Sequence, residues 1–77
     1  MNQNEILELY EKLFGNFEES LGYRLSVRKS ATDNWVVERF YRRSSWVSEQ
    51  FEHRAVFSKE GRLIEPQQKE FGTNKKE

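Results

Sequence analysis

The spacing of apolar residues changes at Gly22 from a helical period to strict alternation, and this change sets the order of the secondary-structure elements. Before Gly22, apolar residues recur every three or four positions, which places them on one face of a helix. They are Ile6, Tyr10, Leu13, Phe14, Phe17 and Leu21. Asn2 and Glu5 match a capping box that would begin the helix, and Gly22 suits the left-handed residue that ends it. Gly15 interrupts the run, but the apolar phase continues across it, so we expect one helix, kinked at most, in preference to two.

Beyond this glycine, apolar and polar residues alternate, which predicts β-strands with one buried face. Tyr23, Leu25 and Val27 share a face of the first strand. The predicted strands are residues 23–29, 35–43, 46–58 and 62–65, with turns at 30–34, 44–45 and 59–61 and a stop at Pro66. The predicted fold class is α+β, an N-terminal amphipathic helix packed on one face of a roughly four-stranded antiparallel β-meander. We assign residues 1–66 to a single α+β domain and residues 67–77 to a flexible polar tail.

Length and composition disfavour several classes of protein. A chain of 77 residues has a small core, which would compete with a catalytic cavity for the same side chains, so we do not expect an enzyme. The chain contains no cysteine, and its histidine and carboxylates form no recognisable ligand set, so we expect neither a cofactor nor a metal site. Because no apolar run is long enough for a membrane span and the first residues do not resemble a targeting peptide, we expect a cytoplasmic protein.

The only histidine, His53, is expected on the helix-packed side of the third strand. It alternates in phase with Val47, Phe51, Ala55 and Phe57. A catalytic histidine needs an orienting carboxylate and a nearby nucleophile, and no motif places either beside it. We therefore interpret His53 as a structural residue.

The formal net charge is +0, but the charges are segregated along the chain. Residues 1–20 carry five glutamates against one lysine, whereas residues 21–63 carry nine basic residues against five acidic ones. The sequence thus combines an acidic helix with a basic sheet. Attraction between helix and sheet within one molecule explains this pattern as well as attraction to a partner does.

Aromatic and arginine residues alternate along the second strand. Successive side chains of a strand point to opposite faces, and only one of these faces can meet the helix. If Val36 and Phe40 lie inside, the other face is left in solvent together with residues of the third strand. The predicted contact surface then consists of Trp35, Arg39, Tyr41, Arg43, Trp46 and Arg54. The two faces of this strand differ little in apolar content, so the sequence leaves open which of them is buried.

Three interpretations of this aromatic–arginine face remain. Arginine stems could simply cover the rings, at roughly 0.5–1 kcal/mol for each cation–π contact. Tyr, Trp and Arg are also enriched at the centres of protein interfaces, and the partner could be another protein or a second copy that pairs along a free strand edge. Binding of single-stranded nucleic acid by stacking and phosphate contacts is less favoured, because the net charge is zero. The expected function is a small non-catalytic protein-binding or regulatory module, with weak nucleic-acid binding as the alternative.

Overall fold

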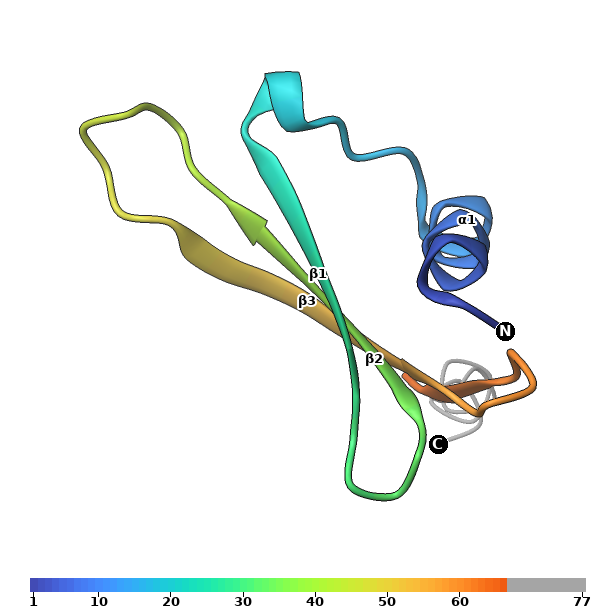
Figure 1. The fold of residues 1–77 in the computed structure, drawn as a ribbon. Helices are drawn as coiled ribbons and strands as arrows, with labels where there is room; N and C mark the ends of the chain where they lie inside the picture. The colour runs from blue at the N-terminus through green and yellow to red at the C-terminus, as the bar shows by residue number, and fades with distance from the viewer. Residues whose placement is uncertain (67–77) are drawn as a thin grey trace, which may run out of the picture.

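The computed structural model describes residues 1–66 as one helix, a short 3₁₀ turn and a four-stranded antiparallel sheet (Figure 1). The elements are α1 (Gln3–Phe14), η1 (Glu19–Leu21), β1 (Tyr23–Lys29), β2 (Trp35–Tyr41), β3 (Gln50–Phe57) and β4 (Leu63–Glu65). The strand order is β1-β2-β3-β4, the meander predicted for an α+β protein. The segment predicted to be a polar tail, residues 67–77, lies outside the described residues. No helix within residues 1–66 is long and apolar enough to cross a membrane.

The capping box predicted at the start of α1 is present. The Asn2 side chain accepts a hydrogen bond from the Glu5 N–H, and the Glu5 carboxylate accepts one from the Asn2 N–H, both at 2.9 Å. The prediction of a single helix reaching Gly22 is wrong, because Gly15 adopts a φ of 118° and turns the chain away from the helix axis after Phe14. Gly22 does adopt the predicted left-handed conformation, but it ends η1.

The helix packs on the face of β2 that carries Trp35 and Val37. Of the two arrangements that the sequence left open, the one with Val36 and Phe40 facing the helix is therefore not the one observed. The core consists of Ile6, Tyr10, Trp35, Val37, Ala55 and Phe57. Strand register explains the choice of face. Val37 lies between Val27 and Ala55 of the neighbouring strands, so apolar residues align across three strands on this side.

A β-bulge in β3 reverses the predicted direction of one aromatic side chain. The pairing shifts between Arg39, which is opposite His53, and Phe40, which is opposite Phe51. The extra residue puts Phe51 on the face away from the helix, whereas Ala55 stays on the helix side. His53 lies on the helix side, as its phase predicted.

The β2–β3 connection is longer than predicted, because β2 ends at Tyr41 and β3 begins at Gln50. Residues 42–49 form a loop in which the Val47 N–H donates to the Ser44 carbonyl at 3.2 Å. In Figure 1 this loop, drawn in yellow-green, carries the hairpin well beyond the end of the sheet covered by α1. We call residues 42–49 the arm.

Candidate functional site

The six residues predicted to form one contact surface occupy three different places. Trp35 is only 7% exposed and belongs to the core. Arg39 and Tyr41 share its face of β2, the side that α1 covers, and Arg54 lies on the opposite face of the sheet. Arg43 and Trp46 are both exposed and lie on the arm. The prediction that Trp35, Arg39 and Tyr41 line an open face is therefore wrong.

Arg39 takes part in a hydrogen-bond network that joins α1 to the sheet. Its guanidinium donates to the Tyr10 hydroxyl oxygen at 3.2 Å, and the Tyr10 hydroxyl lies 2.7 Å from Nδ1 of His53. With the imidazole hydrogen on Nε2, the hydroxyl accepts from Arg39 and donates its own proton to Nδ1, so that each of its two partners is satisfied. Burial lowers the pKa of His53, and the Arg39 charge lowers it further. The network therefore keeps a neutral histidine against a fully buried tyrosine, which is a structural role.

Arg39 is also held by two further contacts. It forms an ion pair with Glu52 at 2.9 Å, and its guanidinium lies 3.9 Å from the centre of the Phe17 ring. Its side chain is only 17% exposed. Arg39 can therefore bind a partner only if the contacts that fix α1 to the sheet are broken.

The face of the sheet away from α1 shows the cover of aromatic rings by arginine that the sequence allowed. The Arg24 guanidinium lies 4.4 Å from the Phe40 ring, which meets Phe51 edge-on at a centroid distance of 5.9 Å. Arg54 is within 3.8 Å of Glu65. Most of the predicted aromatic–arginine pattern thus serves packing within the molecule.

Ion pairs in the described residues stay within the sheet and its connections. They are Arg24–Glu49, Arg28–Glu38, Lys29–Asp33, Arg39–Glu52 and Arg54–Glu65. Within residues 1–66, no ion pair joins the acidic helix to the basic sheet. Arg42 and Arg43 on the arm, and Glu8 and Glu11 on α1, form no ion pair in this part of the chain, although the Arg42 charge contributes to lowering the pKa of Glu49.

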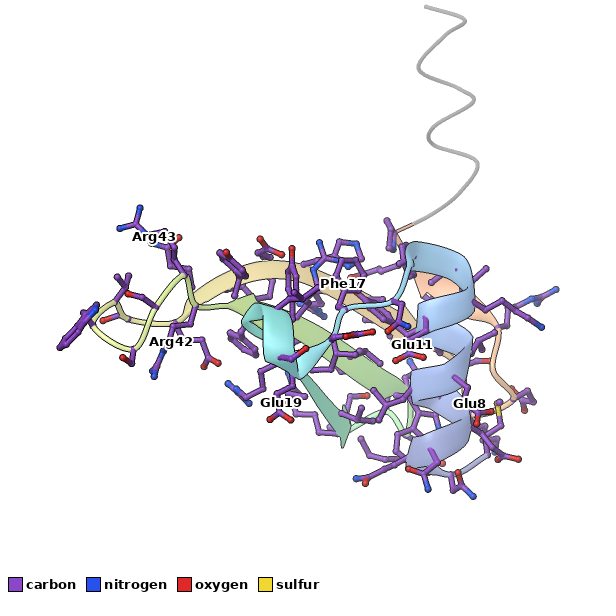
Figure 2. The ribbon with its side chains drawn as sticks, turned by 90° about the horizontal axis from the view of Figure 1, so that it is seen from above. Glu8, Glu11, Phe17, Glu19, Arg42 and Arg43 are labelled. Carbon is purple, nitrogen blue, oxygen red and sulfur yellow. The ribbon has the colours of Figure 1, made fainter. Side chains whose placement is uncertain are left out.

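The end of the arm concentrates exposed aromatic and cationic groups. Trp46 is 91% exposed, and Arg42 and Arg43 precede it by a few residues. Figure 2 shows that the two arginines project to opposite sides of the arm, at the far end of the molecule from Glu8 and Glu11. We call the side chains of Arg42, Arg43 and Trp46 the arm end; Arg42 is the first residue of the arm, and its backbone lies at the base. Sequence reasoning had included Arg43 and Trp46 but placed them on a strand, and it omitted Arg42.

The base of the arm is fixed to β1. The Arg42 N–H donates to the Gly22 carbonyl at 2.8 Å, and the Arg24 guanidinium makes two hydrogen bonds of 2.8 Å to the Glu49 carboxylate. These bonds lower the pKa of Glu49. An open cleft of about 660 Å³ remains between η1 and the arm. Its lining is mainly polar and charged, unlike the mostly apolar pockets that hold small molecules.

A second hollow lies between α1 and β1, and we call it the helix groove. Its cavity volume is about 240 Å³, below the roughly 300–1,000 Å³ of small-molecule pockets. Its lining residues are Leu7, Glu11, Phe17, Glu19, Tyr23, Arg24 and Leu25. Sequence reasoning missed this groove, because the turn at Gly15 that brings Phe17 and Glu19 beside α1 was predicted as continuing helix.

Comparison with known proteins assigns no family to the chain, since no family model, curated protein or solved structure matches it.

Proposed function

We propose that this protein is a small, non-catalytic protein-binding module that contacts its partner through the arm end. The observation that supports the proposal is the 91% exposure of Trp46 in the connection between β2 and β3, which also carries the exposed Arg42 and Arg43. We further propose that it acts in the cytoplasm, because a chain without cysteine does not need an oxidising compartment.

The composition of the arm end favours a protein as the partner. Tryptophan and arginine are the residue types most enriched among side chains that dominate binding energy, and a tryptophan buries a large apolar area with few rotatable bonds. Leu21 and Phe51, which are 64% and 56% exposed, follow it as the next most exposed large apolar side chains in the described residues. A partner that covers Trp46 would therefore gain hydrophobic as well as charge contacts.

Attachment of the arm to β1 supports the same proposal. The Arg42–Gly22 and Arg24–Glu49 hydrogen bonds hold the base of the arm before any partner arrives. Because less conformational freedom is lost on binding, a preorganised loop binds more tightly than a free one with the same side chains.

Single-stranded nucleic acid is the second candidate ligand. An exposed indole beside two arginines without ionic partners in residues 1–66 could stack on a base while the cations contact phosphates. The zero net charge and the glutamates of α1 weaken long-range attraction to a phosphate backbone, so we rank this function lower.

Site-specific photo-crosslinking tests the proposal. A photoreactive phenylalanine replaces Trp46, and a matched control carries it at Lys59, an exposed position in the β3–β4 turn. After irradiation in the host lysate, we expect a discrete protein adduct from position 46 and none from position 59. A nuclease-sensitive adduct would support the nucleic-acid candidate instead, and the same adducts from both positions would refute a specific contact at the arm end.

A further inference from the structure

We propose that the partner of the arm end is a second copy of this chain, with the arm end of each protomer seated in the helix groove of the other. This inference rests on the proposed function, because it uses the same three residues, and it adds the identity and the complementary surface of the partner.

Charge complementarity is the first support. Glu8 and Glu11 form no ion pair in the described residues. Arg42 and Arg43 form none either, although the Arg42 charge helps to lower the pKa of Glu49 at the base of the arm. Figure 2 places the two pairs at opposite ends of the molecule, so they do not neutralise each other within one protomer. Two protomers arranged head to tail would bring each arginine pair to Glu11 in the lining of the other copy's groove, with Glu8 one turn before it on α1.

The shape and lining of the helix groove are the second support. Leu7, Phe17 and Leu25 are half-buried and give it apolar walls, while Glu11 and Glu19 are exposed on α1 and η1. Arg24 also lines the groove, but its charge is paired with Glu49. A groove smaller than a small-molecule pocket suits a single inserted side chain. The arm end offers groups of both kinds, because it combines the exposed apolar indole of Trp46 with two cations that project to opposite sides of the arm.

Symmetry makes the arrangement closed. If the arm of one protomer reaches the groove of the other and the reverse also holds, a two-fold axis relates the copies and no binding surface remains open for further growth. Two equal contacts then stabilise a dimer of one defined size. A chain with zero net charge also meets little overall repulsion when it associates with itself.

A second copy of the chain is the partner that accounts for both the arm end and the helix groove. An acidic partner protein would satisfy the arm end but leave the groove empty. A nucleic acid would contact the arm end, but the glutamates beside the groove would repel it. A second copy supplies the apolar and cationic group for the groove and the acidic surface for the arm.

A charge-swap experiment on the full chain tests the inference. The first variant is Arg42→Glu with Arg43→Glu, and the second is Glu8→Lys with Glu11→Lys. Glu19 is left unchanged because it also lines the cleft at the base of the arm. Sedimentation and light scattering should give the wild type a mass of about twice 9.3 kDa. Each variant alone should associate about a hundredfold more weakly, because like charges then meet at both contacts.

Mixing the two variants is the decisive step. In a mixed pair, the glutamate arm of one chain meets the lysine helix of the other, and the remaining arm and helix are both wild type. We therefore expect a heterodimer close to wild-type affinity. The matched control is Lys59→Glu with Arg62→Glu, which makes the same charge change at the β3–β4 turn and should leave the wild-type dimer intact.

The possible outcomes separate the inference from the proposed function. A wild type that stays monomeric, a dimer insensitive to both reversals, or a mixture that fails to associate would each overturn the inference. An adduct from position 46 to a different protein would leave the proposed function standing in those cases. Circular dichroism verifies that each variant is folded, and Trp46→Ala, which removes the anchor without altering charge, should also weaken the dimer.

Discussion

The Tyr10 hydroxyl offers the sharpest test of how this small core is held together, because it is the only link between the Arg39 guanidinium and the His53 imidazole in the described structure. The change Tyr10→Phe keeps the ring, which is fully buried against Phe14 at a centroid distance of 4.8 Å, and removes only the oxygen. Any loss of stability can then be assigned to the two hydrogen bonds.

The size of the effect follows from the geometry. The bond to His53 is short, and its loss leaves Nδ1 in a half-buried position, a change that costs about 1 kcal/mol or more. The bond from Arg39 is longer, at 3.2 Å, and Arg39 keeps its ion pair with Glu52, so its loss costs less than that of a fully buried charged bond. We expect a loss of about 2 kcal/mol, which corresponds to a fall in Tm of about 8–16 °C for a domain of this size.

Urea unfolding followed by circular dichroism measures this loss, with Tyr41→Phe as the control. The Tyr41 ring packs against Tyr23 in a tilted arrangement at a centroid distance of 4.9 Å, but its hydroxyl makes no hydrogen bond within residues 1–66. The control should stay within about 0.5 kcal/mol of the wild type. Equal losses in the two variants, or no loss in Tyr10→Phe, would refute the role given to the network.

Three further predictions concern other parts of the molecule. The pKa of His53 is lower in the folded than in the unfolded state, so the unfolding free energy should be highest above about pH 6.5 and should fall as the pH drops below that value. Urea titrations at several pH values measure this dependence, and His53→Gln should flatten it down to about pH 5. Gly22→Ala should cost about 2 kcal/mol in the same assay, because φ is 102° and the added Cβ would lie 2.4 Å from the Arg42 carbonyl oxygen, a backbone atom that cannot easily move. In a thermal melt at a protein concentration low enough to keep the wild type monomeric, so that loss of the proposed dimer does not affect Tm, Trp46→Ala should change stability by less than about 0.5 kcal/mol. Trp35→Ala should cost about 3–5 kcal/mol, so equal effects would contradict the assigned burial.

The sequence determined the order of the elements, because their signals are local. A change of apolar period needs only neighbouring residues, and so do the capping pair Asn2–Glu5 and the turn between Ser30 and Asn34. For the same reason β1 was predicted with its observed limits. The prediction of one helix failed at Gly15, where an unbroken apolar phase reflected packing of Phe17 on the sheet and not continuation of the helix.

Only the tertiary structure decided which face of β2 is buried. Val36 is 2% exposed and Val37 is fully buried, so both faces of this strand hold apolar residues and its own sequence gives no preference. The register with β1 and β3 made the choice, because it aligned Val37 with Val27 and Ala55. Long-range pairing also separated the charges, since it tied the sheet arginines to nearby acids and left Arg42 and Arg43 at the end of the arm, away from the glutamates of α1.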